Sequence, residues 1–125
     1  IFSGGKNRAT LKKNRNLNNQ KKLLLENEIN SNKTTVASAW SNYQSSKSML
    51  DSVISQVRAA EIAYEGITIE YESGVGRSTL DVIQSNTLLL DSKISLANSE
   101  RNYLLSQLKL LQSVGLLTAE YLQIN

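Results

Sequence analysis

The sequence predicts an all-α protein, folded as one long antiparallel coiled-coil helical hairpin. Its 125 residues include no Pro and only six Gly, so few positions interrupt a helix. Apolar residues recur at alternating intervals of three and four, which places them along one side of a helix. After Gly4-Gly5, the strongest turn signal is Ser73-Gly74-Val75-Gly76, which separates two helical stretches.

The first long helix is expected over residues 6–72. One stripe with coiled-coil spacing has eight apolar or aromatic residues at its eleven positions: Val36, Trp40, Tyr43, Lys47, Leu50, Ile54, Val57, Glu61, Tyr64, Thr68 and Tyr71. A second stripe, offset around the helix, has smaller residues: Ser46, Met49, Val53, Gln56, Ala60, Ala63 and Ile67. If this helix is continuous it is about 100 Å long and has to be a rod.

A turn at residues 73–78 leads to a return helix at 79–114 and a short C-terminal helix or tail at 115–125. Ser78 and Asp81 have the spacing of a capping box, and Gly115 suits the position after a helix end. Thr118 can cap the short helix that follows.

The return helix also carries two stripes. One stripe is Ile83, Thr87, Leu90, Ile94, Ala97, Arg101, Leu104, Leu108 and Leu111. Its companion is Val82, Asn86, Leu89, Lys93, Leu96, Glu100, Tyr103, Gln107, Leu110 and Val114. Two stripes on each helix predict that each helix has neighbours on both sides, as in a bundle or a closed wall of helices.

The composition argues against an enzyme. Without His or Cys the chain has no Ser-His-Asp triad, no thiol nucleophile and no imidazole or thiolate ligand for a metal. The segment Gly74-Val75-Gly76-Arg77-Ser78 lacks the Lys-Ser/Thr and the preceding strand of a phosphate-binding loop. We therefore expect no catalytic residue, no metal and no cofactor.

The charge is divided unevenly. Residues 1–22 contain seven basic side chains and no acidic one, whereas the remainder contains seven basic and eleven acidic side chains. A basic opening segment can meet nucleic acid or anionic lipid head groups, or it can be a solvated helix face. No aromatic residue interleaves these charges, as stacking on bases would require, so no nucleic-acid partner is expected.

Three stretches resemble a known family. They read Tyr71-Glu-Ser-Gly-Val-Gly-Arg77-Ser-Thr-Leu-Asp81-Val-Ile-Gln, then Leu96-Ala-Asn-Ser-Glu-Arg101-Asn-Tyr103-Leu, then Leu110-Leu-Gln-Ser-Val-Gly115-Leu-Leu-Thr118. They resemble the TolC family of outer-membrane efflux and type I secretion channels. Residues 1–5, Ile-Phe-Ser-Gly-Gly, resemble that family's strand-to-helix junction, so the chain looks like the helical part of its second repeat.

The resemblance implies a trimeric α-barrel that crosses the periplasm beneath an outer-membrane β-barrel. This chain would supply a stub of β-strand at residues 1–5 and the periplasmic tunnel with its entrance gate. The implied partners are two further copies in a homotrimer, a periplasmic adaptor protein, an inner-membrane pump or ABC transporter, and the outer membrane, contacted through strands missing from this chain.

The resemblance also implies roles for residues in and near the turn. Arg77 and Asp81 match the family's gate and constriction, while Tyr71 matches with one extra residue between it and the Arg. Gln84 stands where a second Asp is common. Residues 74–76, Gly-Val-Gly, would contact the adaptor.

Simpler roles remain open for these residues. Asp81 can act only as a helix cap, Tyr64 and Tyr71 can fill a seam, and Arg77 can be a solvated turn residue. Lys47 and Glu61 can set the register of the helices. For the whole chain, the alternatives are a periplasmic adaptor hairpin and a coiled-coil scaffold without a transport role.

Overall fold

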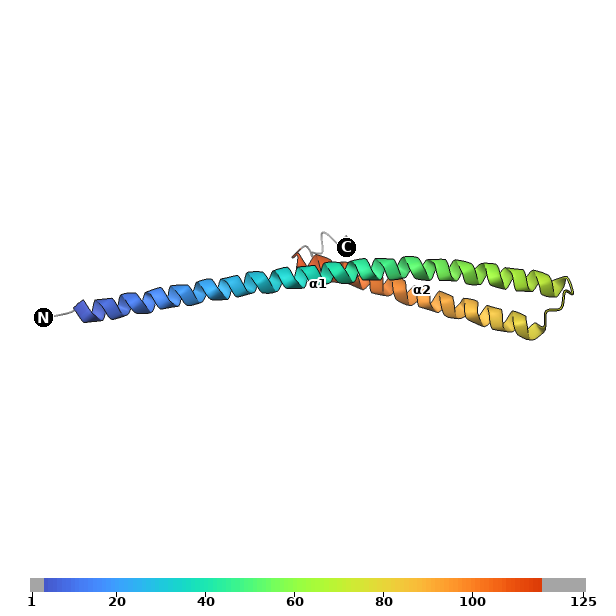
Figure 1. Cartoon of the computed structure of the whole chain (residues 1–125), viewed down its shortest axis with the longest axis horizontal. Helices are drawn as coiled ribbons and strands as arrows, with labels where there is room; N and C mark the ends of the chain where they lie inside the picture. Colours follow the sequence, from blue (N-terminus) through green and yellow to red (C-terminus); the bar gives the residue numbers. More distant parts are fainter. Residues whose placement is uncertain (1–3, 116–125) are drawn as a thin grey trace, which may run out of the picture. The chain divides into compact units, whose positions relative to one another are not determined.

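The computed structural model describes residues 4–115, and it confirms the all-α hairpin. The described chain has two helices, α1 (Gly4–Glu72) and α2 (Thr79–Ser113), joined by residues 73–78 (Figure 1). Gly4 and Gly5, expected at a strand-to-helix junction, are the first residues of α1, where the backbone N–H groups need no acceptor within the helix. Ile1-Phe2 and the expected helix after Thr118 lie outside the described residues.

The chain divides into two units, residues 1–38 and 39–125. In the first unit, residues 4–38 belong to α1, and every side chain except Val36 is exposed. Its side chains are mostly polar all round the helix, and within the described chain no buried apolar face supports this stretch. Among the residues described, no helix is both long and apolar enough to span a membrane.

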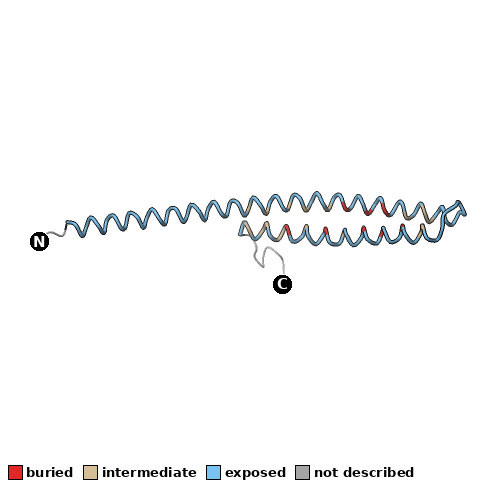
Figure 2. Tube along the Cα trace, turned by 60° about the horizontal axis from the view of Figure 1, so that its bottom comes forward, coloured by how far each residue is buried: buried red, intermediate tan, exposed pale blue. Residues whose placement is uncertain are grey.

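In the second unit, the remainder of α1 and α2 run side by side and bury one row of residues from each helix (Figure 2). We call these two rows the seam. The α1 row is Tyr43, Ser46, Leu50, Val53, Val57, Ala60, Tyr64 and Ile67. The α2 row is Val82, Ser85, Leu89, Ser92, Leu96, Ser99, Tyr103, Ser106, Leu110 and Ser113. Both rows keep the alternating intervals of three and four throughout.

Serine occupies every second position of the α2 row, once every seven residues. Ser92 is the most deeply buried side chain described, at 2% exposure. Its Oγ donates to the carbonyl oxygen of Leu89 at 2.7 Å, and Ser85 and Ser106 make the same bond three residues back. Each hydroxyl is thus satisfied within its own helix, and the small side chain leaves room for the facing helix.

An aromatic cluster lies in the half of the seam far from the turn. The rings of Tyr43 and Tyr103 stack with centroids 5.5 Å apart, and their hydroxyl oxygens lie 3.2 Å apart. Trp40 packs on Tyr43 at 5.6 Å. The hydrogen bond with Tyr43, together with burial, raises the pKa of the Tyr103 hydroxyl.

The expected composition of the stripes was wrong in one respect. The α1 row takes alternate members of the two predicted stripes, such as Leu50 from one and Val53 from the other. Every second residue of the α2 row comes from one predicted stripe. The residues between them are serines, which belonged to neither predicted stripe. Counting only apolar residues missed a row in which a small polar side chain forms its hydrogen bond inside its own helix.

The other predicted stripe of α2, which starts at Ile83, is exposed in this chain as far as Leu104. Its members Ile83, Leu90, Ile94 and Leu104 are 57%, 53%, 60% and 56% exposed. We call these four residues the outer edge of α2. The chain thus buries one side of α2 and leaves another apolar side uncovered.

We predict that Ser92→Leu destabilises the hairpin by about 1–3 kcal/mol, because the larger side chain overpacks the seam. Ser95→Leu makes the same change at an exposed site and should alter stability by no more than about 0.5 kcal/mol. Thermal unfolding followed by circular dichroism at 222 nm compares the two. Equal stabilities would contradict the role assigned to the serine row.

Candidate functional site

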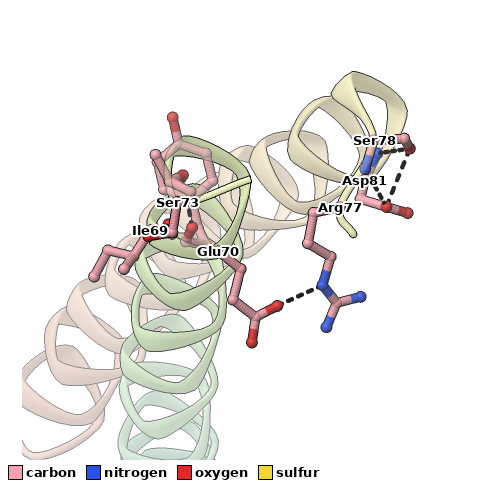
Figure 3. A network of polar contacts seen from close by, with 8 residues as sticks. Ile69, Glu70, Ser73, Arg77, Ser78 and Asp81 are labelled. Carbon is pink, nitrogen blue, oxygen red and sulfur yellow. Dashed lines mark hydrogen bonds and ion pairs between the residues drawn. The ribbon is translucent and has the colours of Figure 1, made fainter. Parts of the chain in front are cut away.

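The turn between the helices is built by local hydrogen bonds at the end of α1 (Figure 3). The N–H of Val75 donates to the carbonyl oxygen of Glu70 at 3.0 Å, and that of Gly74 to Tyr71 at 3.1 Å. These two bonds form a Schellman motif, which requires a residue in the left-handed region at Gly74, where φ is 73°. Gly76 also has positive φ, at 67°, and a Cβ at either glycine would meet open space. The backbone conformation, rather than crowding, therefore favours glycine at both positions.

The start of α2 is the capping box that the sequence predicted. The N–H of Asp81 donates to Ser78 Oγ at 3.3 Å, and the N–H of Ser78 donates to Asp81 Oδ2 at 2.9 Å. The Ser78 hydroxyl adds a third bond to Oδ2 at 3.0 Å. The backbone N–H and then the hydroxyl of Ser78 lower the pKa of the Asp81 carboxyl below its usual range. The capping role of Asp81 is therefore confirmed, and a second role remains compatible with it.

Arg77 pairs with an acidic residue that the sequence did not single out. Its Nε lies 2.5 Å from Glu70 Oε2, and the bond joins the turn to the last turn of α1 (Figure 3). The hydrogen bond to Glu70 and the charge of its carboxylate raise the pKa of the guanidinium. Both side chains are close to half exposed, so water screens the pair and it is a weak tether.

The structure brings three of the four predicted gate residues to the turn. Tyr71 is exposed, and its hydroxyl oxygen lies 3.3 Å from Thr79 Oγ1 across the turn. Arg77 lies between the two helices and pairs with Glu70. Asp81 lies in the first turn of α2 and bonds to Ser78. Gln84 is exposed further along α2. Between the helices, Gly74, Val75 and Gly76 form the exposed tip, with Val75 presenting an apolar side chain.

A second ion pair joins the helices along the seam. Lys93 Nζ lies 3.1 Å from Glu61 Oε1, with both side chains half exposed. Glu61 therefore contacts the facing helix, which fits the register-setting role open to it from its stripe position. An exposed pair of this kind adds little to stability, so its effect is on alignment.

The chemistry available at the turn is polar and electrostatic. Within residues 4–115, no three His, Cys, Asp or Glu side chains are grouped so that they could hold a metal ion. The turn presents one carboxylate fixed by a cap, one guanidinium tethered to Glu70, and a tyrosine hydroxyl. Such groups can form ion pairs and hydrogen bonds with a neighbouring chain.

Sequence reasoning missed Glu70 and the serine row. A signal existed for each: Glu70 and Arg77 are opposite charges on either side of a Gly-rich turn, and serine recurs every seven residues from Ser78 to Ser113.

The family of the chain follows from comparison with known proteins. The family described as outer membrane efflux protein matches residues 1–116. The chain belongs to the outer membrane efflux protein family. No solved structure matches it significantly.

Two relatives illustrate the extent of this likeness to outer membrane efflux proteins. The outer membrane efflux protein BepC of Brucella suis biovar 1 (strain 1330) is 25% identical over 122 residues, covering 98% of this chain and 26% of BepC. The outer membrane protein TolC of Escherichia coli (strain K12) is 30% identical over 86 residues, covering 69% of this chain and 17% of TolC. The chain thus spans about a quarter or less of the length of these relatives.

We predict that Ser78→Ala raises the pKa of Asp81 towards its ordinary value of about 3.9, because one donor to the carboxylate is lost. The folded state lowers this pKa, so the capping contribution is present above the unfolded value and is lost as pH falls through the folded value. An NMR titration of the Asp81 carboxyl carbon measures this pKa, and unfolding followed as a function of pH measures the loss of stability. Ser73→Ala removes a hydroxyl that bonds to Ile69 instead and should leave the titration unchanged; a shift in this control, or none in Ser78→Ala, would contradict the assignment.

Proposed function

We propose that this chain forms part of the helical wall of an outer-membrane export channel, in which hairpins lie side by side around a tunnel across the periplasm. The observation that carries this proposal is the outer edge of α2, an apolar row left uncovered beside a fully formed seam. Membership of the outer membrane efflux protein family supports the same function.

The position of the outer edge favours a single-layered wall. At 100° per residue, the midpoint of Leu90 and Ile94 lies roughly 150° around α2 from the midpoint of Leu89 and Ser92 in the seam. A helix with contacts on two nearly opposite sides fits between two neighbours in a curved layer. A helix inside a compact bundle would instead have apolar residues on more of its circumference.

Burial of the outer edge against a partner would be energetically favourable. Each Leu or Ile there is more than half exposed, and covering it would stabilise an assembly by on the order of 1–2 kcal/mol. Several such residues on each of three copies can offset the entropic cost of association. The partner proposed for this edge is a neighbouring hairpin of the same homotrimer.

The turn is proposed as the tunnel entrance. Tyr71, Arg77 and Asp81 would form the gate, with Gln84 one turn further along α2. Because Arg77 is held by Glu70 in its own chain only weakly, its guanidinium can exchange to an acceptor on a neighbouring helix when the entrance closes. Residues 74–76 would contact a periplasmic adaptor protein, which links the channel to an inner-membrane pump or ABC transporter.

To test the wall, we predict that Leu90→Glu combined with Ile94→Glu abolishes assembly, because the charges would be buried between neighbours. The matched control is Ser95→Glu combined with Asn102→Glu, which adds the same charge to exposed sites about a third of a turn away from the outer edge. Chemical cross-linking of the channel protein in membranes reports the trimer. Normal trimer formation by the Leu90/Ile94 variant would contradict the proposal.

To test the gate, we predict that Arg77→Ser raises single-channel conductance in planar bilayers, because one interaction that holds the entrance shut is lost. Lys109→Ser removes the same charge from an exposed site on α2 away from the turn and should leave the conductance unchanged.

Asp81→Asn should weaken block of the channel by multivalent cations, since it removes one carboxylate per copy. Unchanged conductance in Arg77→Ser together with unchanged block in Asp81→Asn would leave these residues with turn and capping roles alone.

A further inference from the structure

The first 22 residues carry a charge pattern that neither the hairpin nor the gate uses. Seven basic side chains occur there without an acidic one, and all of them are exposed: Lys6, Arg8, Lys12, Lys13, Arg15, Lys21 and Lys22. We call these seven residues the basic segment. The two ion pairs formed within residues 4–115, Glu70–Arg77 and Glu61–Lys93, do not involve it.

This charge pattern destabilises the start of α1. Positive charge in the first turns of a helix is unfavourable, because the helix dipole places a partial positive charge at that end. α1 has no acidic residue in its first turn to compensate. Like charges four apart, such as Arg8 and Lys12, also repel each other. An anionic partner would relieve both effects.

The spacing of the basic segment suits a surface. Arg8, Arg15 and Lys22 are seven residues apart and therefore lie along one line of the helix, separated by roughly 10 Å along its axis. Lys6 and Lys13 repeat this interval on another side of the helix. The basic segment can therefore present positive charge to an anionic layer from more than one side of the helix.

We propose that the basic segment binds the anionic lipid head groups of the membrane in which the channel is anchored. This inference rests on the proposed function and adds to it that the start of α1 lies next to the outer membrane. Head-group phosphates supply the missing negative charge, and basic residues beside an anionic surface bind it through Coulomb attraction. Nucleic acid fits less well, since no aromatic residue occurs from residue 3 to residue 39 to stack on bases.

The test is co-flotation of the chain with vesicles of phosphatidylcholine alone and with vesicles that also contain phosphatidylglycerol. We expect binding only to the vesicles with phosphatidylglycerol, falling steeply as salt rises and the Debye length shortens to about 8 Å at physiological ionic strength. The triple variant Arg8→Gln, Arg15→Gln, Lys22→Gln should bind on the order of 100-fold more weakly, since each charge contributes roughly fivefold. Gln is a good helix former, so circular dichroism should show unchanged helix content.

The matched control is Arg58→Gln, Arg101→Gln, Lys109→Gln, which removes the same charge from exposed sites outside the basic segment. It should bind as the unaltered chain does. Equal loss in both variants would mean that net charge alone drives binding, and it would overturn the proposal. Equal binding to both kinds of vesicle, no binding to either, or tighter binding to duplex DNA would also overturn it. These outcomes leave the channel proposal standing, because trimer formation is measured independently of lipid binding.

Discussion

The hairpin depends on the seam, where a row of alternating serine and larger residues on α2 meets a row of Val, Leu, Ala and Tyr on α1. Ser92 shows how the row works: its hydroxyl bonds to its own helix and its small side chain leaves space for the facing one. This arrangement needs little apolar area to hold two helices together. It leaves the larger residues Leu90 and Ile94 free to serve a second contact on another side of α2.

The turn serves both fold and proposed function with the same residues. Asp81 completes a capping box, and because the residue is only partly buried its carboxylate can also face the proposed tunnel entrance. Arg77 forms an ion pair with Glu70, which positions the guanidinium but is weak because both side chains are close to half exposed. A gate needs such groups, because its closed state has to be stable and still able to open. The positive-φ glycines Gly74 and Gly76, which precede Arg77, let the backbone turn tightly at the tip.

Much of this architecture is legible in the sequence. The two helices, the turn, the Ser78–Asp81 capping box and the helix end before Gly115 follow from local chemistry, since each depends on residues close together in the chain. The membership of the seam was predicted only in part. Burial there depends on how two distant helices meet, and serine carries no apolar signal. The Arg77–Glu70 pair also escaped prediction, because it depends on the path of the turn backbone.

The central claim is that the outer edge of α2 is covered by a neighbouring hairpin. Since the chain has no native Cys, a single cysteine placed at Ile94 or at Asn102 reports its own exposure by the rate of maleimide labelling. In the membrane-assembled protein, the account predicts strong protection of the cysteine at position 94 and rapid labelling at position 102. Equally rapid labelling at both positions would show that the outer edge faces solvent, and it would contradict the account.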